Sequence, residues 1–275
     1  MSVADSTERQ VQRVARSSIL EGLIRIGFVG YALLHIAVGW LALQIALGRP
    51  GDEGDQAGAF RVLAGQPFGR FLLVVVSVGL AAMSVWQLLL AAVGHRAEQG
   101  FSRTFERLAS LGRTVIYAAL AWTSYRIVVG TPTSGAQQQQ NATAGILAQP
   151  AGRFWVTVAG LAVLALGIGM VVYGVRRVFE KRLMTYKMSH SVKTTAIRLG
   201  QAGYIARGVA FGIVGVLLVR AAQTGDPAKS RGLDAALRTL VAQPFGELLL
   251  ILVAVGFLAF GAYCFFQAKY RKVTR

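Results

Sequence analysis

The sequence Gln66-Pro67-Phe68-Gly69-Arg70 decides the fold, because close copies of it occur twice more in the chain. The copies are Gln149-Pro150-Ala151-Gly152-Arg153 and Gln243-Pro244-Phe245-Gly246-Glu247. A short apolar segment precedes each copy, and an uncharged run long enough to cross a bilayer follows it. A second such run lies upstream of each copy. This self-similarity predicts three copies of one unit, each with two membrane-spanning helices.

The composition indicates an integral membrane protein. Of the 275 residues, 54% are hydrophobic and 15% are charged, and the mean hydropathy is +0.52. Soluble domains usually carry about 25% charged residues. Long uncharged runs are required by a bilayer and not by a soluble core. We therefore predict an all-α polytopic fold with six spans, at 26–47, 70–93, 112–130, 154–175, 203–222 and 247–268.

The distribution of positive charge predicts the orientation. The N-terminal segment, the tail and the two connections on their side of the membrane hold seventeen Lys and Arg residues, against six in the other three connections. By the positive-inside rule both termini are cytoplasmic. The net charge of +17 lies in short loops without a recognition motif, so the expected partners are anionic lipids of the cytoplasmic leaflet and not nucleic acid. A protein partner in the membrane stays open.

The domain organisation follows from the repeats. Two spans per repeat give every repeat the same orientation, so the repeats are parallel and related by an axis along the membrane normal. They can close into a ring of six helices with pseudo-threefold symmetry, although linear stacking stays open. The expected units are a cytoplasmic amphipathic segment at 1–24, which lies on the membrane or binds a partner, and repeats at 25–96, 107–182 and 198–272.

The repeated corner has a structural interpretation. Proline fits the first turn of a helix, and it pushes the preceding Gln towards extended geometry. The Gln amide can bond free groups at a helix end, and the Gly lets another helix approach closely. The alternative places three Gln side chains around one outer vestibule. The corner residues are Gln66, Pro67, Gly69, Gln149, Pro150, Gly152, Gln243, Pro244 and Gly246.

The connections that contain the corners differ in their expected structure. In the third, the apolar spacing from Leu233 to Leu240 predicts a short helix at the outer interface. In the second, the Gln-rich tract at 137–141 is most simply a solvated loop.

Alignment of the first helices of the repeats brings arginines into register. Arg113 and Arg207 correspond to Tyr31, and Arg126 and Arg220 correspond to Gln44. One interpretation is contact with lipid phosphates, because arginine near a helix end can reach the interface. The sharper one is an anion or lipid head-group site between repeats. His35 corresponds to aromatic residues in the other repeats and is expected to be a packed residue.

Several classes of function lack candidate residues. None of the six spans has a carboxylate well inside it, although coupled transporters normally need one. No phosphate-binding loop, metalloprotease motif or nucleophile elbow occurs, so we expect no enzyme, no cofactor and no metal. The single cysteine, Cys264, is interpreted as a small buried hydrophobe. The many glycines predict close helix packing, at Gly160, Gly167, Gly169, Gly208 and Gly212.

These features resemble a known family. Three tandem helix pairs, the opening Arg198-Leu-Gly-Gln-Ala-Gly-Tyr204-Ile-Ala-Arg207-Gly208 and the triplicated corner are similar to bacterial membrane proteins built from a triplicated two-helix domain of unknown function. The resemblance covers about residues 20–272. It implies a location in the bacterial inner membrane and supplies no activity. Tyr31 and Ala151 depart from the other copies, which argues against a strictly threefold ligand site.

The leading hypothesis is a non-enzymatic membrane protein that supports a membrane assembly or envelope process through helix and lipid contacts. The rival is a passive transporter or channel for an anion or a lipid, with its path lined by Arg113, Arg126, Arg207 and Arg220. A membrane enzyme with a lipid substrate comes third.

Overall fold

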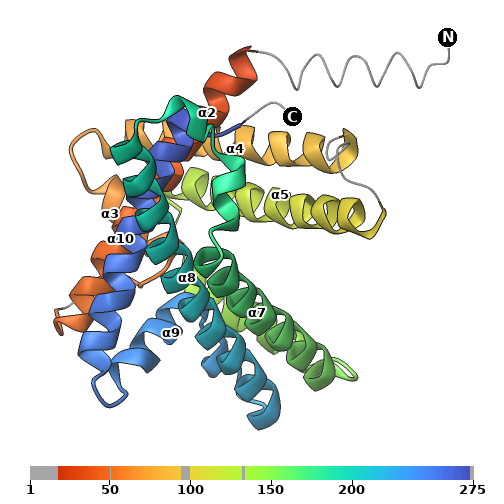
Figure 1. Ribbon diagram of the computed structural model, residues 1–275. Coiled ribbons are helices and arrows are strands. Elements are labelled where there is room, and N and C mark those ends of the chain that lie inside the picture. The colour runs from red at the N-terminus through yellow and green to blue at the C-terminus, as the bar shows by residue number, and fades with distance from the viewer. Residues whose placement is uncertain (1–17, 50, 94–99, 132–133, 273–275) are drawn as a thin grey trace.

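A computed structural model describes residues 18–49, 51–93, 100–131 and 134–272, and these residues are mostly helical (Figure 1). The long helices are α2 (Ser18–Ala46), α4 (Gly69–Val93), α5 (Gly100–Val128), α7 (Gly152–Val175), α8 (His190–Thr224) and α10 (Gly246–Tyr270). The short helices are α3 (Gln56–Ala64), α6 (Gly135–Leu147) and α9 (Gly232–Val241). Short 3-10 turns form η1 (Val178–Arg182), η2 (Thr185–Lys187) and η3 (Pro227–Ser230). The prediction of an all-α fold is confirmed for the described residues.

Five of the long helices are long and apolar enough to cross a membrane, namely α2, α4, α7, α8 and α10. A multi-pass membrane protein is therefore indicated. The helix α5 has 29 residues, but it falls outside this set because arginines and several polar side chains reduce its hydropathy. The expected span at 112–130 therefore stays a prediction.

Two long helices begin earlier than the sequence predicts. Residues 100–111 and 190–202 were expected in loops, but they form the first turns of α5 and α8. Ser189 caps α8 by accepting a hydrogen bond from the Val192 amide at 3.4 Å. Of the predicted amphipathic segment at 1–24, residues 1–17 lie outside the described residues. Residues 18–24 continue without a break into α2.

The helices pack in pairs that mostly join different repeats. The most extensive contacts are between α2 and α10, between α4 and α5, and between α7 and α8. Figure 1 shows these three pairs diverging from a shared region. The α2–α10 pair is close, because a Cβ atom added at Gly261 would lie 2.8 Å from the Ala32 carbonyl oxygen. The first and last repeats therefore touch each other.

Glycines allow α7 and α8 to approach closely, as expected. A Cβ atom at Gly208 would lie 2.6 Å from the Gly167 carbonyl oxygen, and one at Gly160 would lie 3.0 Å from the Gly215 oxygen. Gly212 takes part through its backbone, because a Cβ atom at Gly167 would lie 2.5 Å from the Gly212 nitrogen, but a Cβ added at Gly212 itself would meet only Leu164, at 3.9 Å. The prediction is wrong for Gly169, which is exposed and would meet nothing within 4 Å.

Each Gln-Pro-x-Gly corner is a tight turn that precedes a long helix. The Gly69 amide donates to the Gln66 carbonyl at 2.8 Å, and the equivalent bonds recur at 2.9 and 2.8 Å in the other copies. The third residue of each turn has positive φ: 60° at Phe68, 59° at Ala151 and 58° at Phe245. Proline fixes a negative φ at the second residue of each turn. Negative φ at the second residue followed by positive φ at the third is the pattern of a type II turn. The prediction that proline occupies the first helical turn is wrong, since each helix begins at the glycine.

The glycine of the corner is required by a backbone contact that differs from the predicted one. A Cβ atom at Gly69 would lie 2.2 Å from the Leu63 carbonyl oxygen, and the distance at Gly152 to the Ile146 oxygen would be 2.1 Å. The close neighbour is therefore the end of the preceding short helix, not a separate long one.

The short helices confirm one prediction and correct another. The predicted helix at Leu233–Leu240 is α9. The Gln-rich tract, however, lies in α6 and is not a loop. Ser134 caps this helix by accepting from the Gln137 amide at 3.0 Å, and the Gln137 side chain donates to Asn141 at 2.8 Å. Glutamine is a good helix former, so local capping outweighs the polar composition.

Candidate functional site

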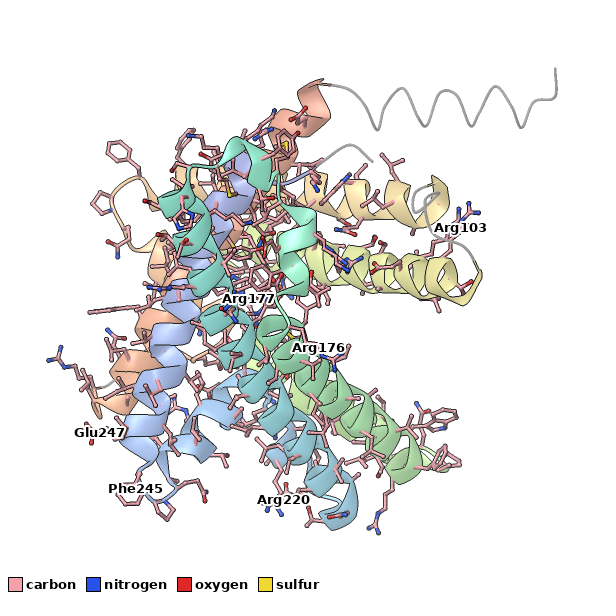
Figure 2. The ribbon with its side chains drawn as sticks, in the orientation of Figure 1. Arg103, Arg176, Arg177, Arg220, Phe245 and Glu247 are labelled. Atoms are coloured by element: carbon pink, nitrogen blue, oxygen red, sulfur yellow. The ribbon has the colours of Figure 1, made fainter. Side chains whose placement is uncertain are left out.

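The long helices end on two chemically different faces. We call the corner face the ends that carry α3, α6, α9 and the three turns. We call the basic face the opposite ends, with η1, η2, the start of α8 and the end of α10. Figure 2 shows Phe245, Glu247 and Arg220 at the corner face and Arg176 and Arg177 near the opposite end of α7.

The centre of the molecule holds Arg207 among aromatic rings. The Arg207 guanidinium carbon lies 4.3 Å from the centroid of the Phe260 ring and 5.8 Å from that of Tyr31. Its Nη2 donates to the Tyr31 hydroxyl at 3.2 Å. Its Nε is covered and has no hydrogen-bond partner among the described residues. Cation–π attraction to the ring faces is therefore the main compensation for burying this charge, and it contributes about 2 kcal/mol in such a site.

His35 and Tyr117 complete this central cluster. His35 is 6% exposed, and its Nδ1 lies 2.8 Å from the Tyr31 carbonyl oxygen. This contact places the proton on Nδ1. The imidazole lies 4.7 Å from the Phe260 ring, and Tyr117 meets Tyr31 edge-on at 5.6 Å. His35 is thus a packed residue, as the sequence predicts.

Arg113, which aligns with Arg207, has polar partners instead. Its Nε donates to the Gln87 side-chain oxygen at 3.1 Å, and its Nη2 donates to the Ser110 hydroxyl at 3.0 Å. Glu106 lies 3.6 Å away and also accepts from Arg182 at 3.2 Å. Burial would lower the pKa of Arg182, but the neighbouring Tyr173 and Glu106 outweigh it and raise the pKa. Arg182 therefore stays a cation.

The basic face has more cations than its carboxylates can neutralise. Its described carboxylates are Glu21, Glu106 and Glu180, and each already forms an ion pair. Exposed cations that have no ion pair among the described residues remain, and they include Arg176, Arg177 and Arg198. This face therefore carries an excess of exposed positive charge.

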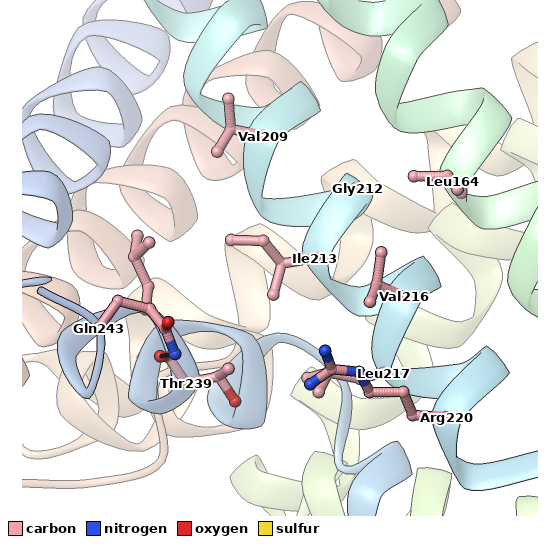
Figure 3. Close-up of a pocket in the computed structure, with 10 residues that line it drawn as sticks. Leu164, Val209, Gly212, Ile213, Val216, Leu217, Arg220, Thr239 and Gln243 are labelled. Atoms are coloured by element: carbon pink, nitrogen blue, oxygen red, sulfur yellow. Dashed lines mark hydrogen bonds between the residues drawn. The ribbon is translucent and has the colours of Figure 1, made fainter. Parts of the chain in front are cut away.

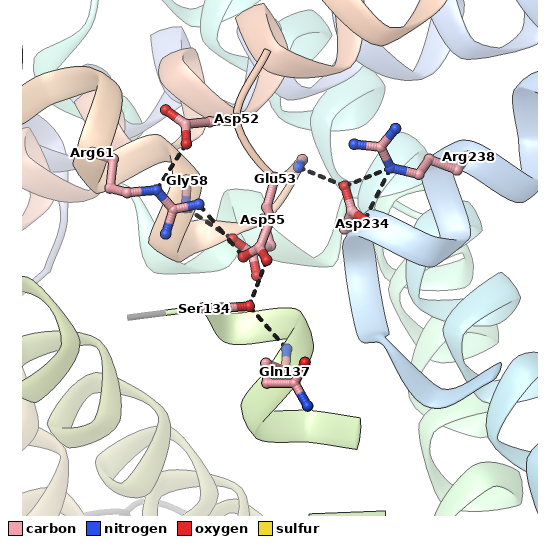
Figure 4. Close-up of polar contacts among 10 residues, drawn as sticks. Asp52, Glu53, Asp55, Gly58, Arg61, Ser134, Gln137, Asp234 and Arg238 are labelled. Atoms are coloured by element: carbon pink, nitrogen blue, oxygen red, sulfur yellow. Dashed lines mark hydrogen bonds and ion pairs between the residues drawn. The ribbon is translucent and has the colours of Figure 1, made fainter. Parts of the chain in front are cut away.

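The corner face carries an acidic network that joins the short helices (Figure 4). Asp234 on α9 accepts from the Gly54 amide at 2.9 Å and from Arg238 Nε at 3.0 Å. Asp55 caps α3 by accepting from the Gly58 amide at 2.9 Å. Ser134 at the start of α6 bonds to Glu53. The network therefore joins the segments that link the two long helices in each of the three repeats.

Burial determines the protonation behaviour of this network. Asp55 is 2% exposed, and its burial raises the pKa of its carboxyl group. The Gly58 amide opposes this shift, and nearby Glu53 adds to it. Burial would lower the pKa of Arg61, but its bond to Asp52 outweighs that effect and raises the pKa.

The structure separates the predicted arginine contacts. Arg113 and Arg207 lie near one aromatic cluster, whereas Arg220 lies at the corner end of α8 beside a groove (Figure 3). Arg126, in the last turn of α5, does not line that groove. The corner glutamines are exposed, and two of them bond back to their own short helix: Gln66 to the Val62 oxygen and Gln243 to the Thr239 oxygen, both at 3.3 Å.

Comparison with known proteins identifies the family. The family model described as Domain of Unknown Function (DUF1206) matches three times, at residues 26–94, 108–177 and 202–271. The chain belongs to this family. An "Uncharacterized protein YxxB" from Bacillus subtilis (strain 168) is 32% identical over 254 residues, which cover 91% of this chain and 90% of that protein. No solved structure matches the chain.

Membership in the DUF1206 family confirms the resemblance seen in the sequence, and it carries no activity with it. Sequence reasoning missed two parts of the site. The aromatic ring nearest to Arg207 is that of Phe260, which lies in an ordinary apolar run and gives no signal in the sequence. Arg182 was counted only among the positive charges of a loop, and its contact with Glu106 was not predicted. Tyr31 did give a signal, because it stands where the other DUF1206 repeats of this chain have arginine.

Proposed function

We propose that this protein is a non-enzymatic integral membrane protein that supports a membrane assembly or envelope process by holding anionic phospholipids at its basic face. One observation carries the proposal: every described carboxylate on that face is already paired, while exposed arginines are left without a counter-ion among the described residues. Anionic head groups supply the missing charge, at about 1 kcal/mol for each Lys or Arg near the surface. Because the carboxylates of this face are engaged in ion pairs, they favour lipid contact over acid–base chemistry as its role.

The proposal includes the arrangement in the membrane. Six helices cross the bilayer, with α5 as the sixth, and both termini lie in the cytoplasm of a bacterial cell. The basic face then meets the anionic leaflet, as the positive-inside rule requires. The exposed apolar side chains of the long helices meet lipid tails; Val115, Leu166 and Leu252 are each at least 60% exposed.

We further propose that the three repeats form a pseudo-threefold ring. Contacts between equivalent positions support this. Tyr31 and Arg207 occupy the same place in the first and third repeats and are hydrogen-bonded to each other. Tyr117 of the second repeat, which corresponds to His35, packs on the same tyrosine. The first helices of all three repeats thus meet at one cluster.

A deletion strain tests this function. Loss of the protein should change lipid composition, envelope integrity or the state of membrane complexes, and the wild-type copy should restore it. A copy with Arg176→Gln, Arg177→Gln and Arg198→Gln should be inserted normally but restore little. The matched control removes the same charge from the corner face, with Arg70→Gln, Arg153→Gln and Arg231→Gln. A deletion strain unchanged in all three properties would overturn the proposal.

A passive transporter for an anion or a lipid is the second candidate. The observation in its favour is the covered Nε of Arg207, which has no partner among the described residues. Against it, aromatic rings fill the space around this guanidinium. Liposome flux that disappears when Arg113, Arg126, Arg207 and Arg220 are neutralised would favour this candidate.

A further inference from the structure

We propose that a groove between α8 and α9 binds one anionic phospholipid, with an acyl chain along α8 and the phosphate at Arg220. The inference deepens the proposed function, on which it rests, by adding a specific lipid site on the corner side. It commits to a lipid because the groove combines a long apolar wall with a cation at one end only.

The groove has the size of a ligand site. Its volume is about 400 Å³, within the range of roughly 300–1,000 Å³ found for small-molecule sites. Leu164 of α7 forms one side, and Gly212 and Val216 of α8 form the wall. Thr239 of α9, Gln243 of the corner and Arg220 lie at the polar end (Figure 3).

The apolar wall matches the depth of one lipid leaflet. From Val209 to Arg220 the groove follows α8 for about 16 Å, at ~1.5 Å per residue. Half of a hydrocarbon core of ~30 Å is about 15 Å. A lipid whose head group lies at Arg220 would therefore place its chain along the whole wall.

Gly212 shows that the protein itself does not fill this space. The neighbouring glycines are required by helix packing, because added Cβ atoms at Gly208 and Gly215 would lie 2.6 and 2.5 Å from backbone atoms of α7. At Gly212 the nearest atom would be a methyl group of Leu164 at 3.9 Å. Val209 and Val216 on the same wall are each 40% exposed. The backbone of Gly212 does lie close to Gly167 of α7, but the side of Gly212 from which a side chain would project is open, and the wall there is apolar.

The polar end of the groove is complementary to a phosphate. Arg220 is exposed, and its guanidinium has no ion pair or hydrogen bond among the described residues. Figure 3 shows it extended from α8 towards Thr239 and Gln243. The Thr239 hydroxyl also has no hydrogen bond within the described parts of the chain. A guanidinium fork and a hydroxyl donor suit phosphate oxygens.

Photolabelling tests the site on the full-length protein. The protein is reconstituted in phosphatidylcholine vesicles with either phosphatidylglycerol or phosphatidylcholine carrying a diazirine at the end of one acyl chain, and labelled peptides are mapped. Phosphatidylglycerol should label the Val209–Leu217 part of α8 more strongly. Arg220→Gln should reduce this labelling roughly tenfold, as expected for one charge-assisted contact. Gly212→Leu should abolish labelling by both probes.

Matched variants and a second readout make the outcome decisive. Arg126→Gln and Gly169→Leu, which make the same changes outside the groove, should leave the labelling unchanged. Equal labelling by both lipids, or labelling that survives Arg220→Gln, overturns the site. Displacement of the label by inorganic phosphate alone overturns the assignment to a lipid. The basic face is tested separately, by retention of phosphatidylglycerol in the variant with Arg176→Gln, Arg177→Gln and Arg198→Gln. Retention should fall in this variant if the proposed function is right. The groove and the basic face can therefore fail independently.

Discussion

The residue between proline and glycine in each corner adopts a backbone conformation that L-residues avoid. Phe68, Ala151 and Phe245 have positive φ, which costs about 1–2 kcal/mol for a residue with a Cβ atom. Phe68 and Phe245 are 87% and 83% exposed, so packing within the described protein does not repay this cost. An aromatic residue there suits the interfacial zone of a membrane, where aromatic side chains concentrate.

Ala151→Gly tests this strain directly, because alanine has no aromatic contact to lose. We expect the variant to be more stable by about 1 kcal/mol, which raises the melting temperature in detergent by roughly 2–4 °C. Gly152→Ala should have the opposite effect, since its Cβ would lie 2.1 Å from the Ile146 oxygen. Thermal unfolding of both variants checks the pair. A lower melting temperature for Ala151→Gly would contradict the turn assignment.

The aligned positions Tyr31, Arg113 and Arg207 show how far single residues could be read from the sequence. Alignment correctly marked them as related, and two of them are bonded to each other. It could not show that Arg207 packs on aromatic rings, whereas Arg113 donates hydrogen bonds to Gln87 and Ser110. These partners come from other helices, so only the packing of the helices determines them.

At the scale of helices, the contact between α7 and α8 depends on glycine. Gly208→Ala would place a Cβ 2.6 Å from the Gly167 carbonyl oxygen, a backbone atom that cannot move alone. We expect the helices to separate and the stability to fall by about 1–3 kcal/mol. Gly169→Ala, on the exposed side of α7, is the control and should change little. Melting temperatures of the two variants in detergent give the comparison, and equal losses would contradict the packing.

The stability of the contacts between α3 and its neighbours should depend on pH because of Asp55. Its pKa is raised by burial in the folded protein, so the folded state holds the proton more tightly than the unfolded chain. The contribution of Asp55 to the free energy of unfolding is then most favourable at acid pH, and it becomes less favourable as the pH rises from about 4 through the raised pKa. Asp55→Asn keeps a good helix cap and removes the buried charge.

Thermal unfolding from pH 3 to pH 8 tests this expectation. Asp55→Asn should be more stable than the wild type at neutral pH, and the difference should shrink towards pH 3. Asp52→Asn, at a more exposed carboxylate of the same network, is the comparison. A difference between Asp55→Asn and the wild type that grows in acid would contradict the assigned direction.

Among the short helices, the sequence predicted one and missed another for physical reasons. In α9 an apolar face points to buried neighbours, which gives a helical period in the sequence. In α6 the same position in the repeat is filled with glutamines and carries no apolar period. Its helix depends on the cap at Ser134 and on contacts with the other short helices, including a close approach of Gly232 to Gln139. Such tertiary contacts leave no local pattern.

At the scale of the whole molecule, the ends of the chain close on each other through α2 and α10. Ile36 and Gly261 lie in contact across this pair, with 2.6 Å between an added Gly261 Cβ and Ile36 Cγ1. In a Cys264→Ala background, the pair Ile36→Cys and Gly261→Cys should form a disulfide on mild oxidation. The pair Ile36→Cys and Gly169→Cys should not. Mass spectrometry of peptides reads the crosslink, and its absence would contradict closure of the first repeat on the last.

The sequence predicted the repeats, the all-α architecture and most helix positions, because long apolar runs and a triplicated corner are local signals. It left open how the repeats meet, because the same runs fit a line or a ring. The contacts of α2 with α10 bring the first and last repeats together, and they depend on Gly39 and Gly261, which in the sequence are ordinary residues of an apolar run. The groove beside Arg220 was equally hidden, since it requires α9 to lie against α8.

The retention of anionic phospholipid by the purified protein tests the central claim most directly. The protein is extracted gently with its native lipids and analysed by native mass spectrometry. The wild type should retain anionic phospholipids in preference to zwitterionic ones. The variant with Arg176→Gln, Arg177→Gln and Arg198→Gln should lose most of them, and the corner-face variant with Arg70→Gln, Arg153→Gln and Arg231→Gln should keep them. Equal retention by all three proteins, or no preference for anionic lipid, would contradict the account.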